Sequence, residues 1–189
     1  PGLVFDNGYM FPQMYIRGIG SVTTTPGLEQ PVALYVDGAY MPRANGTLFD
    51  LLDVSSVQVL KGPQGTLYGR NATGGAILVT TADPTFRFEG KASAEYGRFD
   101  HRRLEGVINV PVSDTLAFRF AGLYAHDDGF VKNLVTGEDI RGTDGYTLRA
   151  KMKWEPVNEF SAVLTGELQH NTLKSAAAGR QVAPLPFCV

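Results

Sequence analysis

The sequence predicts an α+β domain followed by an antiparallel β-meander that forms part of an incomplete transmembrane β-barrel. Up to about Ala82, short apolar runs are separated by Gly, Pro, Asn and Asp, as in a domain of small, closely spaced elements. After Pro84, long segments alternate between apolar and polar residues, which is typical of strands with one apolar face. We therefore predict two parts, residues 1–82 and 83–189.

Composition limits the classes of protein to which the chain can belong. Its 189 residues are 43% hydrophobic and 19% charged, so the chain is long enough and apolar enough to fold. A formal net charge of −2 gives no basic surface for nucleic acid. Cys188 is the single cysteine, which excludes an intrachain disulfide. The first residues lack the parts of a signal peptide, so we expect the chain to begin inside a longer protein.

The first part contains signals for short strands and helices. The segment PVALYVDGAYM alternates around Asp37 and Gly38, a dipeptide that favours a tight hairpin. Thr47 predicts the N-cap of one short helix. Pro63 predicts the start of a second helix over residues 64–68, which Gly69 can end with a positive φ. The segments VQVL and GAILVTT complete a short mixed sheet.

Glycine-rich turns in this part raise the question of phosphate binding. The segment from Leu60 to Thr81 fails the P-loop pattern, because Arg70 and Asn71 follow its glycines where Lys and Ser or Thr are required. The segment RGIGSVTT fails the dinucleotide pattern, because Thr23 stands in place of the third glycine. No nucleophile elbow or HExxH motif is present. We therefore expect neither an enzyme nor a cofactor.

The second part predicts five strands. The segments FRFEGKASAEYG, YTLRAKMKWE and FSAVLTGELQHN alternate cleanly, and RLEGVINVPV and TLAFRFAGLYAH alternate less purely. A soluble antiparallel sheet with one buried face would give the same alternation. The connections favour a membrane barrel, because the short turns VSDT and EPVNE fall at one end and the long loop from Asp127 to Asp144 falls at the other.

Three histidines fall at the long-loop end. These are His101, His126 and His170, and the segment HDDG adds two carboxylates beside His126. The strands that carry His126 and His170 are not neighbours, so their rings start about 10 Å apart. We expect a polar rim at this end and no metal site.

Three segments resemble the TonB-dependent outer-membrane receptors. They are MYIRGIG, PVALYVDGAYM and LLDVSSVQVLKGPQGTLYGRNATGGAILVTT, which resemble the Ile-Arg-Gly segment, the Val-Asp-Gly hairpin and the late-plug signature of the family. Ser55 and Ser56 depart from the acidic–basic pair that is usual there. The resemblance implies that the glycines are scaffold of the plug domain, namely Gly18, Gly62, Gly65, Gly69, Gly74 and Gly75.

The resemblance also implies a function. Such receptors sit in the bacterial outer membrane, contact its lipid, and take up a scarce ligand, most often a ferric siderophore, with energy from TonB. The family barrel has many more strands than five, and the segment that contacts TonB is missing, so we expect this chain to be a fragment. The alternative is a soluble periplasmic or surface binding module that does not transport.

Site residues follow from the family layout. In the family layout, two plug loops point outward, and we predict that five of their residues face the ligand. The alternative is that these are ordinary loop residues. They are Thr23, Thr24, Tyr40, Met41 and Arg43. Arg17 and Arg70 resemble plug arginines that pair with the barrel wall, the alternative being solvent exposure. If the first strand leaves the periplasmic end, Lys91, Arg149 and Lys151 face the lumen, and the lipid-facing set is Phe86, Phe88, Ala92, Ala94, Tyr96, Leu148, Met152, Trp154, Leu164 and Leu168.

Overall fold

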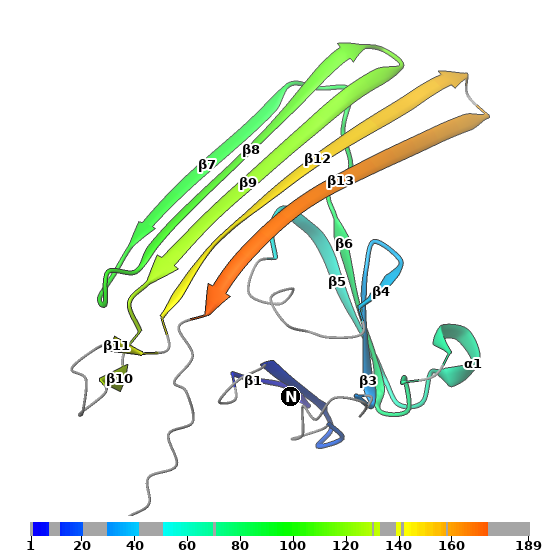
Figure 1. The fold of residues 1–189 in the computed structure, drawn as a ribbon. Helices are drawn as coiled ribbons and strands as arrows, with labels where there is room; N and C mark the ends of the chain where they lie inside the picture. The colour runs from blue at the N-terminus through cyan, green and yellow to red at the C-terminus, as the bar shows by residue number, and fades with distance from the viewer. Residues whose placement is uncertain are drawn as a thin grey trace, which may run out of the picture.

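Two sheets dominate the computed structural model of the chain (Figure 1). A four-stranded mixed sheet, called the mixed sheet below, comes from the first part, and a five-stranded antiparallel sheet, called the long sheet, comes from the second. The described residues are 2–7, 12–20, 30–41, 51–69, 71–129, 131–132, 139–140, 142–157 and 159–173. No helix among them is long and apolar enough to cross a membrane.

The mixed sheet has the strand order β4-β3-β6-β5. Its strands are β3 (Val32–Val36), β4 (Ala39–Met41), β5 (Val54–Lys61) and β6 (Gly75–Thr81). Strands β3 and β6 are parallel, and the other two pairs are antiparallel. The predicted mixed sheet is thus confirmed, with the two most apolar strands at its centre.

The predicted turn and one predicted helix are also present. Asp37 and Gly38 join β3 to β4 with φ angles of 48° and 81°, which is the left-handed conformation that the dipeptide favours. Helix α1 (Gly65–Tyr68) ends at Gly69, whose φ is 74°. The helix expected after Thr47 begins among residues that lie outside the described ones, and residues 51–53 are not helical.

A hairpin that the sequence did not predict precedes this sheet. Strands β1 (Leu3–Asn7) and β2 (Pro12–Ile16) pair antiparallel. Met14 and Ile16 of β2 are 3% and 0% exposed and pack into the apolar core of the mixed sheet. Burial of this strand against a neighbouring sheet therefore fixes the hairpin.

The long sheet is a meander in chain order, as predicted. Strands β10 (Val131–Lys132) and β11 (Asp139–Ile140) form a separate short pair in its long connection. The long sheet itself has the order β13-β12-β9-β8-β7. These strands are β7 (Glu89–Tyr96), β8 (Arg102–Ser113), β9 (Leu116–Asp127), β12 (Thr143–Val157) and β13 (Phe160–Leu173).

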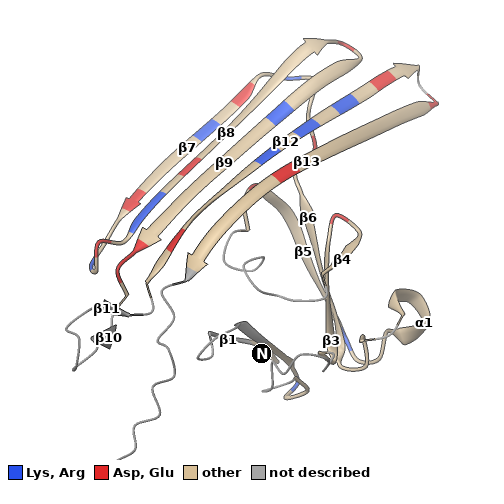
Figure 2. Ribbon diagram, in the orientation of Figure 1, with Lys and Arg blue, Asp and Glu red and all other residues tan. Residues whose placement is uncertain are grey.

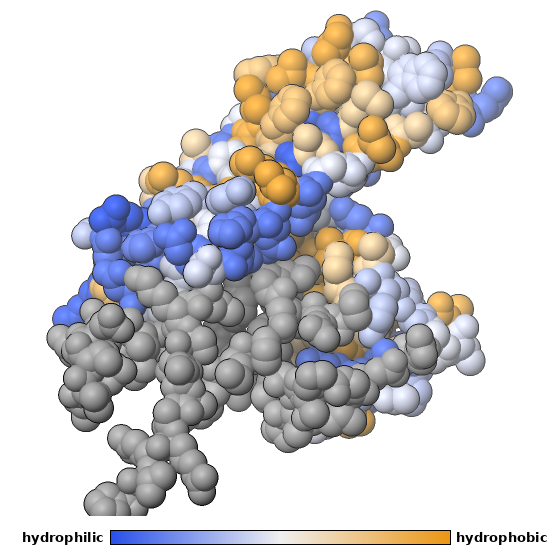
Figure 3. Space-filling model, in the orientation of Figure 1, coloured by the Kyte–Doolittle hydropathy of each residue, from blue (hydrophilic) through white to orange (hydrophobic). Residues whose placement is uncertain are grey.

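The register of the long sheet separates its residues into two faces. Arg149 lies opposite Ala121 and Glu167, on the face toward the mixed sheet, here called the inner face. Leu148 lies opposite Gly122 and Leu168, on the outer face. Apolar side chains gather over the short-turn end of the sheet, and hydrophilic ones gather toward the long-loop end (Figure 3). The large apolar residues of the outer face are exposed and include Leu104, Ile108, Phe120, Tyr146, Leu148, Trp154, Leu164 and Leu168.

Phe86 does not follow the predicted alternation. Strand β7 begins at Glu89, and the preceding residues cross the inner face, where Asn109 binds the backbone of Thr85 and Arg87. The Phe86 ring lies with its centroid 5.4 Å from Nζ of Lys153, an inner-face residue. The prediction that Phe86 faces lipid is therefore wrong.

Gly75 is the glycine whose replacement we expect to damage the mixed sheet. Its φ is 144°, and a Cβ there would clash with the carbonyl oxygen of Leu60 and with Ile16. We expect Gly75→Ala to lower the free energy of unfolding by more than about 1 kcal/mol, since the native conformation is incompatible with a side chain. Thermal unfolding measures this, and Gly65→Ala, where a Cβ would meet no atom within 4 Å, is the matched control. Equal melting temperatures for the two variants would contradict the prediction.

Candidate functional site between the two sheets

The inner face of the long sheet contacts two segments, one from the first part and one from the connection between the two parts. The first segment leads into β5, and its Leu52 is fully buried against Val107, Ala121 and Leu123 of the long sheet. The second begins at the last residue of β6 and runs from Thr81 to Arg87. The apolar cluster around Leu52 is small, so most of the contact is made by polar and charged side chains.

Arg119 and Asp53 form a two-pronged ion pair across this contact. Nε of Arg119 donates to Oδ2 of Asp53 at 2.6 Å, and Nη2 donates to Oδ1 at 2.7 Å. The two side chains are only 13% and 12% exposed. Paired donors of this kind combine charge attraction with a fixed orientation. The pair therefore holds the start of β5 in one position on β9.

Lys151 connects three segments. Its Nζ lies 2.9 Å from Oδ1 of Asp83 and 3.3 Å from Oδ2 of Asp37, and the side chain is 4% exposed. Asp37 in turn accepts hydrogen bonds from the backbone N–H of Thr81 at 2.7 Å and from its hydroxyl at 2.5 Å. A buried ammonium requires such partners, because an isolated charge there is costly. One cation of the long sheet thus joins the β3–β4 turn to the end of β6.

Arg149 and Asn109 complete the contact. Arg149 donates from Nη1 to the carbonyl oxygen of Leu52 at 2.6 Å and from Nε to Glu167 at 2.7 Å. Asn109 is fully buried, donates to the carbonyl oxygens of Thr85 and Arg87 at 2.7 and 2.6 Å, and accepts from the Thr85 N–H at 3.0 Å. The connection between the two sheets is therefore fixed by side chains of the long sheet.

Charge is distributed unequally over this contact. The cations Arg119, Arg149 and Lys151 come from the long sheet, where Figure 2 shows blue bands on β9 and β12. The carboxylates Asp37 and Asp53 come from the first part. Polar interfaces of this kind resemble those between domains that separate, because water can replace each partner. The arrangement can therefore hold one domain against another and still release it.

A cavity of about 450 Å³ lies between the sheets beside this contact. Its lining includes apolar residues of the mixed sheet and polar residues of β12 and β13, among them Val36, Met41, Arg149, Thr165, Glu167 and Gln169. Of the predicted ligand-facing residues, Met41 lines this cavity. Tyr40 is 39% exposed and its hydroxyl accepts a hydrogen bond from Asn71. Thr23, Thr24 and Arg43 lie outside the described residues.

The structure places the remaining predicted residues as follows. Arg17 is exposed with a φ of 52°, and its backbone N–H donates to Gly2. Arg70 and Cys188 lie outside the described residues. Arg149 and Lys151 lie on the inner face, as predicted. The sequence did not indicate the roles of Asp53, Arg119 or Asn109, because nothing in a local pattern links residues so distant in the chain.

Asp37 gives the contact a dependence on pH. Burial raises the pKa of its carboxyl, but the hydrogen bonds from Thr81 and the charge of Lys151 outweigh burial, and the pKa lies below its ordinary value of 3.8. The pKa of Asp37 is lower in the folded chain than in the unfolded chain. The stabilisation by the ionised carboxylate is therefore fully present above the unfolded pKa. The stabilisation is lost as pH falls through the lowered pKa.

We expect Asp37→Asn to remove part of this acid sensitivity. The free energy of unfolding of the natural chain should fall more steeply below about pH 4 than that of the variant, because only the natural chain must protonate this carboxylate. Urea unfolding at a series of pH values measures both slopes. Identical slopes would show that Asp37 does not carry the dependence.

Comparisons with known proteins agree with this two-part architecture. The family model described as TonB-dependent Receptor Plug Domain matches residues 1–76. The pesticin receptor of Yersinia pestis is 34% identical over 160 residues, which are 82% of this chain and 23% of that receptor. The ferrioxamine receptor of Yersinia enterocolitica is 25% identical over 71% of this chain and 19% of its own length. The chain thus spans about a fifth of the length of these relatives.

Solved structures extend the likeness to the long sheet. The ferric yersiniabactin uptake receptor FyuA from Yersinia pestis matches 90% of this chain and 27% of its own, with a TM-score of 0.80 and 30% identity. The pyoverdine outer membrane receptor FpvA from Pseudomonas aeruginosa matches 90% of this chain and 24% of its own, with a TM-score of 0.72 and 19% identity. The second likeness concerns the fold alone.

Proposed function

Because this chain belongs to the TonB-dependent receptors, we propose that its mixed sheet is part of a plug inside a barrel whose wall includes the long sheet, and that the receptor takes up a ferric siderophore. Uptake would cross the bacterial outer membrane with energy from TonB. The names of two similar receptors, for ferric yersiniabactin and ferrioxamine, support an iron-chelate cargo. The proposed division at residues 82 and 83 falls between β6 and β7.

The observation that carries the proposal is the polar contact between plug and wall. Arg119, Arg149 and Lys151 hold acidic and carbonyl groups of the plug at distances of 2.6 to 3.3 Å. A plug held by buried apolar surface would cost much free energy to expose, whereas ions and amides that separate can be hydrated. The contact is therefore suited to a plug that a pulling force displaces and that returns afterwards.

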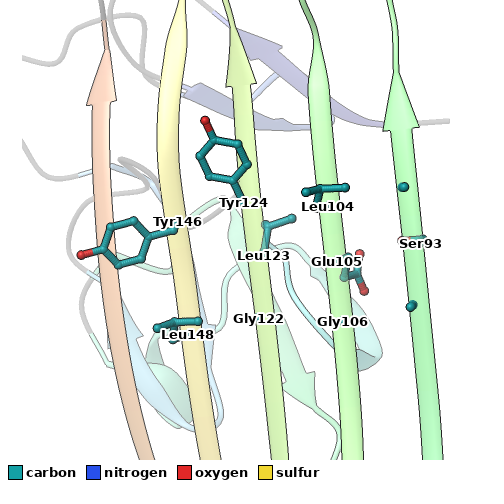
Figure 4. Close-up of a pocket in the computed structure, with 11 residues that line it drawn as sticks. Ser93, Leu104, Glu105, Gly106, Gly122, Leu123, Tyr124, Tyr146 and Leu148 are labelled. Carbon is teal, nitrogen blue, oxygen red and sulfur yellow. The ribbon is translucent and has the colours of Figure 1, made fainter.

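The outer face of the long sheet supports contact with lipid. A groove of about 650 Å³ crosses this face where Ala92, Gly106 and Gly122 lie side by side in the register (Figure 4). Leu104 and Leu148 flank the two glycines. A row of apolar groups with a shallow depression can pack against acyl chains, whereas a soluble module would leave this surface exposed to water.

The wall also has an orientation in this proposal. The plug reaches the periplasm, so β7 leaves the periplasmic end, and the short turns after β8 and β12 lie in the periplasm. The long connection between β9 and β12 then faces outward, in agreement with the loop lengths of outer-membrane barrels. Tyr40 and Met41 remain candidates for ligand contact, and Arg17 remains a candidate for contact with the barrel wall.

Uptake by the full-length receptor tests the proposal. Cells that depend on this receptor should accumulate radioactive iron supplied as a siderophore chelate, and should lose that uptake when TonB is deleted. Uptake that persists without TonB would contradict the energy source. A receptor that leaves the membrane fraction without detergent would favour the soluble binding module instead.

A crosslink between plug and wall tests the role of the contact. Leu52 and Ala121 share one buried cluster, so Leu52→Cys with Ala121→Cys, in a Cys188→Ser background, should permit a disulfide between the two parts. We expect the oxidised receptor to bind its chelate but not to transport it, and reduction to restore transport. Transport that is unchanged after complete oxidation would show that the plug does not move at this contact.

A further inference from the structure

The three cations that hold the plug each have a second partner outside the plug. These cations are Arg119, Arg149 and Lys151, and their side chains are 13% exposed or less. One set of partners belongs to the first part of the chain, which moves in the proposed function. The other set belongs to the second part, which forms the wall and its connection to the plug. The two sets are compared below for each cation.

Arg119 divides its nitrogens between Asp53 of the plug and Glu89 of the wall. Nε and Nη2 donate to the Asp53 carboxylate at 2.6 and 2.7 Å, whereas Nη1 lies 3.7 Å from Oε2 of Glu89. Glu89 begins β7, and the register places it in one row with Asn109 and Arg119. A separation of 3.7 Å is longer than a hydrogen bond, so the contact with Glu89 is the weaker one. If Asp53 moved away, Arg119 would still have a carboxylate of its own sheet within reach.

Arg149 is shared in a similar way between the plug and β13. Its Nη1 donates to the carbonyl oxygen of Leu52 at 2.6 Å, and its Nε donates to Oε2 of Glu167 at 2.7 Å. Glu167 lies opposite Arg149 in the β12–β13 register, so this ion pair is internal to the long sheet. Movement of the plug would remove the carbonyl oxygen and leave the ion pair in place.

Lys151 has its second partner in the connection between the two parts. Nζ lies 2.9 Å from Oδ1 of Asp83 and 3.3 Å from Oδ2 of Asp37 in the plug. Asp83 is followed by residues 85–87, whose backbone is bound by the side chain of Asn109. Asn109 is fully buried and belongs to β8, so these hydrogen bonds hold the connection on the long sheet. Asp83 can therefore stay beside Lys151 when Asp37 moves away.

We propose, on the basis of the proposed function, that Glu89, Glu167 and Asp83 are positioning residues for transport, which keep the three cations paired while the plug is displaced. A buried cation that loses its partners is costly, whereas a cation that retains a carboxylate stays neutralised. The retained pairs therefore lower the free energy of the displaced state. They also keep each cation directed toward the place to which the plug returns.

A purely structural role for Glu89 predicts the opposite effect of its removal. If Glu89 only stabilised the folded receptor, its loss would loosen the plug. If Glu89 instead takes over Arg119, its loss raises the free energy of the displaced state, because the hydrogen bonds from Arg119 to Asp53 are unchanged in the closed state. The plug then leaves the wall less often. The two roles differ in the sign of one measurable rate.

Labelling of a cysteine at the contact measures how often the plug leaves the wall. Leu52→Cys in a Cys188→Ser background places a thiol at a fully buried position, which a maleimide reaches after the plug separates from the long sheet. In the purified full-length receptor with these two changes, we expect Glu89→Gln to lower the labelling rate by about two- to fivefold, as for the loss of one partly exposed ion pair. Glutamine keeps an Oε1 acceptor for the hydroxyl of Thr85.

Glu95→Gln is the matched control. Glu95 shares β7 and the inner face with Glu89 and is 67% exposed against 51%, but its carboxylate lies 3.7 Å from His101. We expect this variant to be labelled at the rate of the receptor that carries only the two cysteine changes. An unchanged or faster rate in Glu89→Gln, or an equal decrease in both variants, would overturn the proposal.

Uptake kinetics distinguish the role of Glu89 from the proposed function. With radioactive iron supplied as in the uptake experiment above, Glu89→Gln should lower the maximal rate and leave the half-saturating chelate concentration unchanged, because displacement follows binding. Failure of the natural receptor to take up iron with TonB would contradict the proposed function. Equal maximal rates for Glu89→Gln and Glu95→Gln, in a receptor whose natural form transports, would contradict the role of Glu89 alone.

Discussion

Arg119→Met is expected to loosen the plug in the full-length receptor by about 3 to 5 kcal/mol, since it removes one partner of a buried ion pair. The Asp53 carboxylate, 12% exposed, would stay in place without the two donors that Arg119 supplies at 2.6 and 2.7 Å. Methionine preserves most of the volume of the arginine stem, so the loss reports mainly the unpaired charge. The effect should be local to the segment that leads into β5 and to the strand itself.

Hydrogen exchange of backbone amides in β5 and β6 measures this loosening. A loss of 3 kcal/mol corresponds to roughly a hundredfold lower protection, because each 1.4 kcal/mol is a factor of ten. The double variant with Asp53→Asn also lacks the unpaired carboxylate, and asparagine tolerates the φ of 53° at this position. This variant should regain part of the lost protection. Lys91→Met is the control, because Lys91 is 72% exposed and its pair with Glu105 should contribute no more than about 1 kcal/mol. Equal effects of Arg119→Met and Lys91→Met would show that the buried pair does not hold the plug.

Leu164→Arg is expected to impair insertion of the barrel. Leu164 is 66% exposed on the outer face, opposite Met152 in the register, and we place it in contact with lipid. An arginine on the lipid face costs about 2 to 4 kcal/mol near the bilayer midplane. The fraction of receptor that migrates as a folded barrel on gels without heating measures the loss. That fraction should fall well below that of the natural receptor.

Thr165→Arg, one residue along, is the matched control. Thr165 lies on the inner face, lines the 450 Å³ cavity and is opposite Lys151. Lys151 is already paired with Asp83 and Asp37, so we expect the added like charge to cost less than about 1 kcal/mol. If Thr165→Arg were the more damaging change, the faces of β13 would be inverted and the register displaced by one residue.

Local pattern was enough to predict much of the fold. The alternation from Tyr146 to Trp154 assigned Arg149 and Lys151 to the inner face, because side chains of a strand point to opposite faces at every step. The turn at Asp37 and Gly38 was predictable for a similar reason, since both residues tolerate a positive φ. The glycine-rich signature resembled a plug, and the family comparison bears out that resemblance.

The local sequence pattern gave the wrong structure where contacts with a distant segment determine the path of the chain. The alternation continued through Phe86, but Asn109 binds the backbone on either side of it and carries the chain across the inner face. The β1–β2 hairpin was not predicted, although Asn7 and Gly8 provide a turn signal between its strands. Met14 and Ile16 of this hairpin are buried in the core of the mixed sheet. At Phe86, by contrast, a contact with another part of the chain outweighed the local preference.

The sequence by itself determined which face of each wall strand is polar, and only the tertiary structure decided which charges on that face meet. Arg119 and Asp53 are 66 residues apart in the chain, and nothing near either residue specifies the other. His126 likewise meets Asp144 because the register of β9 and β12 places the two residues opposite each other. Alternation along a strand indicates which of its faces is polar. Which charges on that face form pairs depends on how the mixed sheet is positioned against the long sheet.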